Sequence, residues 1–318
     1  MLLDVPGIRL GHRSLGDTGV TAIVSADPAG MRAAVDVRGG GPGTRETDLL
    51  APHNTVERVH AILLTGGSAF GLAAADGAMR ELESRGLGFP VFGEGRPGPR
   101  VPIVPAAVIF DLVVGSPDHR PDPTDGAAAV GAALDGPLGA GSGSVGAGCG
   151  ATAGVLRGGF GSASCRVGDH VVAAGVVANP VGSVIDPASG RFYGDPSRPA
   201  VDTAAFSSLE RPTPALNTTI GVIATDAPLS VAHLQRIAIA GHDGIGRAVR
   251  PAHSPLDGDT LFAVSTAPDG VEMWGAGDVE KHAALCEAAA EVVASAIVDA
   301  VAAAEPGFGI TAWTEIAY

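Results

Sequence analysis

The chain has 318 residues, 46% of them hydrophobic but only 4% aromatic, and its formal net charge is −14. This length suffices for one large domain or two ordinary ones, with a core built mainly of aliphatic side chains. The negative charge excludes the basic surface that nucleic acids and anionic membranes require, so we expect neither partner. The three cysteines are widely spaced and odd in number, which argues against a disulfide framework and favours a reducing, cytoplasmic compartment.

No segment predicts export or membrane insertion. Residues 1–14 lack the basic start and continuous apolar run of a signal peptide. The best candidate for a membrane span, His282–Glu305, contains Glu287, Glu291 and Asp299, and it predicts a packed helix instead.

Short runs rich in Val and Ile, bounded by Gly, Pro, Asp or Asn, alternate along the chain with segments of helical periodicity. The alternation is irregular and shows no repeat of fixed period, so it predicts layered sheets flanked by helices. The expected elements, in chain order, are strands at Val20–Ser25, Ala33–Arg38 and His60–Thr65, a helix at Ala69–Arg85, a strand at Ala106–Val114, a helix at Asp125–Leu134, strands at Val171–Ala178 and Thr219–Thr225, a helix at Ser230–Ala240, a strand at Leu261–Thr266 and a helix at Lys281–Ala304.

Two proline-rich stretches, Gly115–Thr124 and Asn179–Pro214, predict long connections. A connection as long as the second is uncommon inside a compact protein, and it is usually either functional or disordered. It runs into Leu216–Ile220, at the head of an expected buried strand. An exposed loop that meets a strand in this way is a suitable place for a processing site.

Two glycine-rich motifs resemble known signatures but fail their tests. Gly141–Gly146 has the spacing G-x-G-x-x-G, yet no clear strand precedes it and no acidic residue follows about twenty positions on. Thr65–Gly71 lies between a strand and a helix, as a nucleophile elbow does, but Phe70 occupies the place of the second glycine. We therefore expect a tight turn in which Ser68 caps the helix. The histidines are scattered, so we expect neither a metal site nor an organic cofactor.

A hydroxyl residue precedes the strand expected at Thr219–Thr225. Thr218 could act as a nucleophile if it became an N-terminal residue, because its α-amino group, with a pKa near neutrality, would then be its base. Such a terminus arises when the Thr218 hydroxyl attacks the carbonyl of Asn217 and water releases the resulting ester. The residues alone also fit an ordinary turn before a strand.

Blocks of residues along nearly the whole chain resemble the DmpA-type family of L-aminopeptidase D-amidase/esterases, which includes the β-peptidyl aminopeptidases. The resemblance implies an α/β (α+β) fold, a four-layer αββα sandwich of the DmpA/ornithine acetyltransferase type. It also implies one domain, 1–318, that cleaves itself between Asn217 and Thr218 into an α subunit, 1–217, and a β subunit, 218–318. These αβ units are expected to form a homo-oligomer. The matching blocks are Gly7–His12, Asp36–Thr44, Leu64–Leu72, Val101–Asp111, Gly146–Gly154, Asn217–Thr219 and Asp257–Asp259.

The resemblance further implies roles for four residues. Thr218 matches the N-terminal nucleophile, and Asn179 matches an asparagine near the oxyanion, where an amide N–H can stabilise developing charge. Asp257 and Asp259 flank a glycine where relatives carry a Ser-Gly-acid group that binds the substrate amine and holds the nucleophile. Two carboxylates can hold an ammonium, that of Thr218 or that of a substrate, although Asp-Gly also favours a solvated turn and Asn179 before a proline fits a turn as well.

The leading prediction is a self-processing aminopeptidase or amidase acting on small peptides, amides or esters with a free N-terminus. An acyltransferase of the ornithine acetyltransferase type is an alternative, which would pass the acyl group to an amine rather than to water. A non-catalytic binding protein of the same fold is another, and an unprocessed chain would favour it. An esterase that uses Ser68 is the last.

Overall fold

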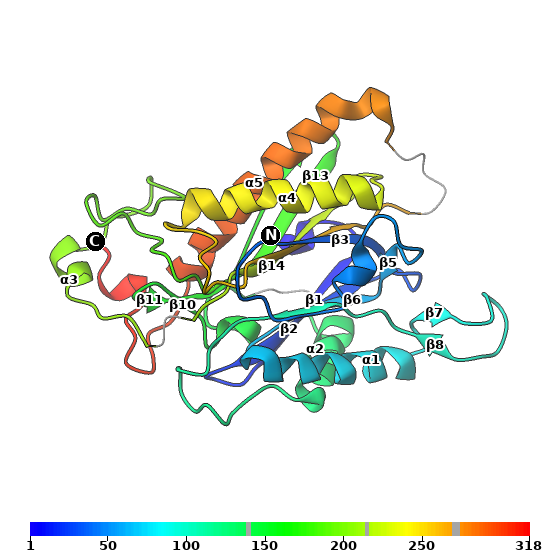
Figure 1. Ribbon diagram of the computed structural model, residues 1–318, viewed down its shortest axis with the longest axis horizontal. Coiled ribbons are helices and arrows are strands. Elements are labelled where there is room, and N and C mark those ends of the chain that lie inside the picture. The colour runs from blue at the N-terminus through cyan, green and yellow to red at the C-terminus, as the bar shows by residue number, and fades with distance from the viewer. Residues whose placement is uncertain (138–140, 214–215, 269–273) are drawn as a thin grey trace.

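Two mixed β-sheets stack face to face, and a pair of helices covers the outer face of each (Figure 1). The structure is a computed structural model, and it describes residues 1–137, 141–213, 216–268 and 274–318. The covering helices are α1 (Ala74–Ser84) and α2 (Pro123–Asp135) on one side, and α4 (Val231–Ala248) and α5 (Val279–Ala302) on the other.

The first sheet has five strands in the order β1-β2-β6-β9-β4. β6 and β9 pair in parallel, and the other neighbours pair antiparallel. Its strands are β1 (Ile8–Ser14), β2 (Gly19–Ser25), β4 (Thr44–Arg45), β6 (Ala61–Thr65) and β9 (Ala106–Val108).

The second sheet has six strands in the order β12-β13-β14-β15-β3-β5. β14 and β15 are parallel neighbours joined through α4, as a parallel crossover requires, and the remaining pairs are antiparallel. Its strands are β3 (Met31–Val37), β5 (Arg58–Val59), β12 (Gly159–Val167), β13 (His170–Ala178), β14 (Ile220–Thr225) and β15 (Thr260–Ser265).

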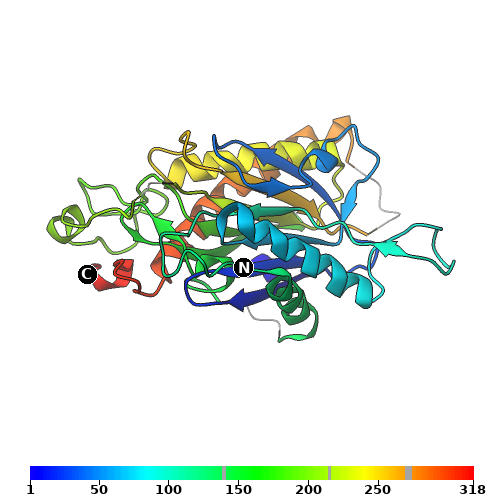
Figure 2. The same cartoon turned by 60° about the horizontal axis from the view of Figure 1, so that its bottom comes forward.

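Shorter elements lie at the two ends of the sandwich. The hairpin β7–β8 extends from one end, and β10, β11, α3 and the C-terminus lie at the other (Figures 1 and 2). These elements are β7 (Phe89–Pro90), β8 (Arg100–Val101), β10 (Thr152–Ala153), β11 (Leu156–Arg157) and α3 (Thr203–Ser207). The chain also forms 3₁₀ turns at Leu2–Asp4, Asp48–Leu50, Ser68–Ala73, Gly146–Gly148, Ala276–Asp278 and Trp313–Glu315.

Three apolar clusters separate the four layers, and side-chain alternation along the strands builds them. In β14, Val222 points into the cluster between the sheets, while Ile223 points into the cluster under α4 and α5. In β6, Ile62 faces the other sheet and Leu63 faces α1 and α2. Strands with both faces covered need apolar residues at every position, which is why their sequence runs are continuous. The expected αββα sandwich is therefore confirmed.

The strand expected at Ala106–Val114 ends at Val108. The reason is Asp111, whose carboxylate accepts the Thr18 hydroxyl and the Gly67 N–H, each at 2.7 Å. These bonds tie the chain after β9 to the turn after β6. The chain leaves β9 after Val108 and brings this carboxylate to its two donors, so the apolar run alone overestimates the strand.

Helix α4 continues to Ala248, beyond the end expected at Ala240. Glycines usually weaken a helix, but Gly241 lies against Ile223 of β14, and a Cβ at 241 would collide with that side chain. The glycine lets the helix lie close to the sheet, so tertiary packing outweighs local propensity.

Strands β1 and β12 are absent from the sequence expectations. β1 carries Arg9, His12 and Arg13, and β12 contains Gly159 and Gly161, so neither has the Val and Ile signal of a strand. Each pairs antiparallel along its length with a strand of clear pattern, β2 or β13. β1 and β12 are therefore strands because they pair with β2 and β13, whose sequences clearly favour strands.

The connection expected at Asn179–Pro214 is ordered over its described part, and Pro214 lies outside the described residues. Ile185, Phe192 and Val201 are buried in the cluster under α4 and α5. The segment therefore covers the core rather than forming the exposed loop that its prolines suggest. Among the described residues, no helix has both the length and the apolar character needed to cross a bilayer.

Burial keeps three histidines neutral, because it lowers the pKa of His12, His60 and His242 to about 4. In the unfolded chain a histidine titrates near about 6.5, so between pH 6.5 and 4 the unfolded state binds protons that the folded state does not. The free energy of unfolding should therefore decrease as the pH is lowered through this window, by about 2 kcal/mol per histidine at pH ~4.5 relative to pH 7. Burial raises the pKa of Asp111 to about 6 and also raises that of Asp257, and these two acids oppose the trend.

Urea unfolding at pH 7 and at pH 4.5 measures this loss, and His60→Asn is the matched variant. His60 Nδ1 accepts the Ile103 N–H at 3.1 Å, and an asparagine oxygen can accept the same bond without titrating. We expect the variant to lose less stability than the parent chain between the two pH values. An equal loss in both proteins would refute the assignment to His60.

Candidate active site

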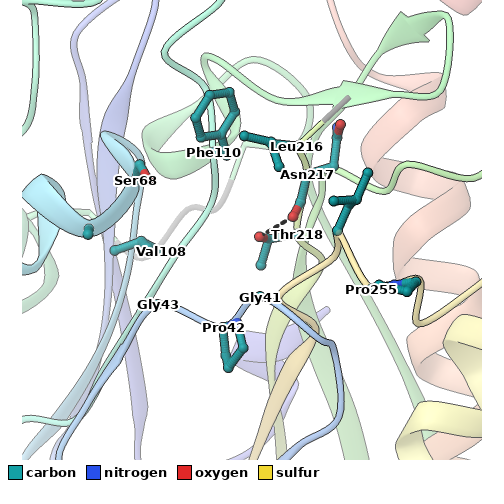
Figure 3. Close-up of a pocket in the computed structure, with 12 residues that line it drawn as sticks. Gly41, Pro42, Gly43, Ser68, Val108, Phe110, Leu216, Asn217, Thr218 and Pro255 are labelled. Carbon is teal, nitrogen blue, oxygen red and sulfur yellow. Dashed lines mark hydrogen bonds between the residues drawn. The ribbon is translucent and has the colours of Figure 1, made fainter. Parts of the chain in front are cut away.

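A cleft of about 280 Å³ opens between the two sheets (Figure 3). Its walls come from the segments that follow β3, β6 and β9 and from those that precede β14 and β15. None of its 12 lining residues carries a charge, so the cleft offers a neutral surface. They are Gly41, Pro42, Gly43, Ser68, Ala69, Val108, Phe110, Leu216, Asn217, Thr218, Pro255 and Leu256.

Thr218 lies in this cleft, just before β14, and only 4% of it is exposed. Its hydroxyl donates a short hydrogen bond to the carbonyl oxygen of Asn217, the group that it is expected to attack (Figure 3). Its N–H donates to the main-chain carbonyl of Asn179 at 2.7 Å. The Gly258 N–H donates to the same Asn217 oxygen at 3.3 Å, and so provides a donor where negative charge would develop.

Gly258 is a glycine because its neighbours leave no room for a side chain. A Cβ at this position would lie 2.7 Å from the Gly41 carbonyl oxygen and 2.9 Å from Thr218 Oγ1. The Asp-Gly-Asp motif therefore brings main chain against the hydroxyl, which no larger residue would permit.

Asp257 is 1% exposed, so the solvated turn that Asp-Gly favours is wrong here. One of its carboxylate oxygens accepts the Val181 N–H at 2.9 Å, and the other accepts the Ser254 N–H at 3.2 Å. Burial raises the pKa of Asp257, and the charge of Asp259 raises it further. Asp257 thus ties the segment after Asn179 to the loop before β15.

Asp259 is also 1% exposed, and it bonds on both sides. Its Oδ1 accepts the Thr219 N–H at 2.7 Å, one residue from the expected nucleophile, and its Oδ2 lies 2.8 Å from His253 Nδ1. Neither Asp257 nor Asp259 lines the cleft. Both expected acids are therefore beside Thr218, but their carboxylates face the main chain around it.

Sequence reasoning missed His253, which the scattered histidines gave no reason to single out. It has a left-handed φ of 54°, and its ring meets that of buried His242 edge-on, with centroids 5.0 Å apart. His242 Nε2 lies 3.1 Å from the main-chain oxygen of Asp36. His253 therefore fixes the outer face of Asp259, and its place six residues before that acid is the only signal in the sequence.

Asn179 is fully buried, and its side chain is engaged on both ends. Its Oδ1 accepts the Thr152 N–H at 2.8 Å, and its Nδ2 donates to the Phe110 carbonyl at 3.1 Å. In the uncleaved chain it contacts Thr218 through its main-chain oxygen. The oxyanion role expected for its amide stays a prediction, and it would require the amide to exchange Phe110 for the reacting oxygen.

The structure also shows the local conformation of the two glycine-rich motifs. Ser68 begins the 3₁₀ turn after β6 but makes no capping hydrogen bond, so the cap expected there is wrong. The physical reason is that Ser68 has a left-handed φ of 52°, whereas a capping residue adopts an extended main chain. Gly141–Gly146 leads into a 3₁₀ turn rather than joining a strand to a helix. The described residues contain no metal-binding cluster of His, Cys, Asp or Glu.

Comparisons with known proteins identify the family of the chain. The family model described as peptidase family S58 matches residues 1–313. An uncharacterized aminopeptidase of Mycobacterium leprae is 46% identical over 97% of this chain and 92% of its own length. A 6-aminohexanoate-oligomer endohydrolase of a Kocuria strain is 36% identical over 83% of this chain and 74% of its own length.

Solved structures share the fold. A Burkholderia β-aminopeptidase matches with a TM-score of 0.74 at 25% identity, over 98% of this chain and 90% of its own. The L-aminopeptidase D-Ala-esterase/amidase of Ochrobactrum anthropi, described as a variant of the Ntn hydrolase fold, matches with a TM-score of 0.73 at 23% identity, over 95% of this chain and 85% of its own. The resemblance drawn from the sequence is confirmed, and the chain belongs to peptidase family S58, the family of the DmpA-type and β-aminopeptidases.

Proposed function

We propose that this hydrolase cleaves its own chain between Asn217 and Thr218, and then uses Thr218 to release N-terminal residues from small peptides, amides or esters. One observation carries the proposal: the Thr218 hydroxyl contacts the carbonyl oxygen of Asn217, and the Gly258 N–H binds that same oxygen. Nucleophile, carbonyl and oxyanion donor are thus assembled before any cleavage.

In the self-cleavage step, Thr218 Oγ bonds to the carbonyl carbon of Asn217 while the C–N bond to Thr218 breaks. The hydroxyl proton passes to that nitrogen, and the product is an ester of Asn217 with the Thr218 hydroxyl. The Gly258 N–H stabilises the charge that builds on the oxygen. Water then hydrolyses the ester, leaving a carboxyl group on Asn217 and a free α-amine on Thr218.

In turnover, Thr218 Oγ attacks the acyl carbon of the substrate in the same way. The α-amine takes the hydroxyl proton and returns it to the leaving amine, and water then releases the acyl group. The Asn179 carbonyl, which accepts the Thr218 N–H at 2.7 Å, holds this amine beside the hydroxyl. Asp257 and Asp259 fix the main chain on either side.

The experiment is a denaturing gel of purified protein followed over time, with N-terminal sequencing of the smaller band. We expect pieces of 217 and 101 residues from the 318-residue chain, the smaller beginning Thr-Thr-Ile-Gly. A single full-length band in a preparation that hydrolyses peptides would rule out self-cleavage as the source of activity.

An acyltransferase would form the same acyl-enzyme as a hydrolase. The two activities differ only in the group that accepts the acyl group, an amine or water. The match to a peptidase family supports water as the acceptor. Product analysis with and without added ornithine tests this, and we expect the free acid in both cases.

A further inference from the structure

The side chain of Asn217 lies in a small subsite beside the cleft. Only 7% of the residue is exposed, and its Nδ2 lies 3.1 Å from Thr152 Oγ1, 3.3 Å from the Thr152 carbonyl oxygen and 3.4 Å from Asn179 Oδ1. We call these three oxygens the Thr152/Asn179 subsite.

All three oxygens present lone pairs to Asn217. The orientation of the Asn179 amide is fixed on both ends, because its Nδ2 donates to the Phe110 carbonyl and its Oδ1 accepts the Thr152 N–H. The Thr152 hydroxyl donates to Asn179 Oδ1 at 3.3 Å, so its proton is committed and it accepts from Asn217. The subsite is therefore built for an N–H donor.

Self-cleavage makes Asn217 a chain end, and a substrate can take its place. The substrate carbonyl must lie where the Asn217 carbonyl lies, next to Thr218 Oγ and the Gly258 N–H. The group on the acyl side of that carbonyl then extends as the Asn217 side chain does, in which Nδ2 is separated from the carbonyl carbon by four bonds.

We propose that the Thr152/Asn179 subsite binds an N–H donor of the substrate, carried on the acyl group four bonds from the carbonyl that is cleaved. A side-chain carboxamide or a γ-ammonium has this geometry. A carboxylate is rejected, because it would face three acceptors. This inference rests on the proposed function, since it takes the self-cleavage geometry as that of a bound substrate.

Three p-nitroanilides test the inference with processed enzyme: those of 3-carbamoylpropanoic acid, of 4-oxopentanoic acid and of butanedioic acid. The first carries the amide of asparagine, the second replaces its NH₂ by CH₃, and the third carries a carboxylate. We expect kcat/KM for the carbamoyl compound to exceed that of the methyl ketone at least about tenfold, because the ketone leaves the acceptors unpaired. The carboxylate should be the poorest.

Thr152→Val removes one acceptor while keeping the branched shape, and Thr124→Val on the exposed first turn of α2 is the control. We expect the valine at 152 to shrink the carbamoyl-to-ketone ratio several-fold and the control to leave it unchanged. The ratio on the processed fraction is independent of how much protein folds or matures. Equal kcat/KM for the two compounds would overturn the subsite and leave the proposed function intact, as would no hydrolysis of all three by processed protein that still cleaves an aminoacyl p-nitroanilide with a free N-terminus. No hydrolysis of that aminoacyl compound either would overturn both.

Self-cleavage gives a second readout that needs no external substrate. Asn217→Leu keeps the size but lacks the donors, and Asn217→Asp turns a carboxylate toward the acceptors. We expect both to slow the appearance of the smaller fragment at least about tenfold, with aspartate slowed more at pH 7 than at pH 4, where it is partly protonated. Cleavage of both variants at the parent rate would contradict the subsite.

Discussion

Replacing Thr218 with alanine is expected to leave a folded, full-length chain that neither cleaves itself nor hydrolyses amides. The change removes the attacking hydroxyl but keeps the main-chain N–H that bonds to Asn179, and it removes few atoms from the core. Loss of a catalytic nucleophile costs on the order of 10⁴-fold or more in rate. A denaturing gel, circular dichroism and an amide-hydrolysis assay measure the three outcomes.

The next residue supplies a matched control. Thr219 is fully buried, and its Oγ1 has no hydrogen-bond partner in the described part of the chain, so Thr219→Val alters neither shape nor bonding. We expect this variant to cleave and hydrolyse normally, and Thr218→Ser to keep cleavage, since a primary hydroxyl can make the same attack. Normal processing of Thr218→Ala together with failure of Thr219→Val would move the nucleophile by one residue.

The second large effect is expected from Asp259→Asn, which should lower kcat/KM on the order of a hundredfold. The buried carboxylate accepts the Thr219 N–H and faces His253, so its charge acts on the residue next to the reacting amine. Removing a buried charge costs far more than removing a surface ion pair, which is worth only about 0–1 kcal/mol. Asp257→Asn is the companion variant, because the main-chain N–H groups that Asp257 accepts belong to Val181 and Ser254, which are not neighbours of Thr218 in the chain.

Free and N-acetylated forms of one peptide amide separate the two ammonium roles that the sequence leaves open. If Asp259 serves the amine of Thr218, Asp259→Asn slows both substrates equally. If it serves the substrate amine, the acetylated form is poor from the start and the variant slows only the free form. Because neither carboxylate lines the cleft, we expect the first result. Near-normal turnover of both substrates by the processed variant would exclude either role.

The sequence predicts those features that a local pattern controls. β14 is visible because both of its faces are buried, and Thr218 and the two acids are visible through blocks shared with a family. His253 is not, because its contact with Asp259 depends on a left-handed turn that no pattern announces. Ser68 is misjudged as a cap because its main chain has a left-handed φ of 52°, which the sequence pattern does not reveal. The sequence also does not predict side-chain orientation. It places Asp257 and Asp259 near Thr218, but it does not indicate that their carboxylates point away from the cleft.

The strand order of the second sheet implies that the peptide bond between Asn217 and Thr218 helps this sheet to form before it is cut. β14 and β15 come from the later part of the chain, yet they lie between β13 and β3, which come from the earlier part. If the two parts were made separately, the first would carry a gap with two open strand edges, and open edges invite aggregation. The intact chain supplies the missing strands at a high effective concentration. Once the sheet has closed, cutting the bond releases nothing, so we expect fragments 1–217 and 218–318 to elute together after cleavage but to fail to reconstitute activity when mixed.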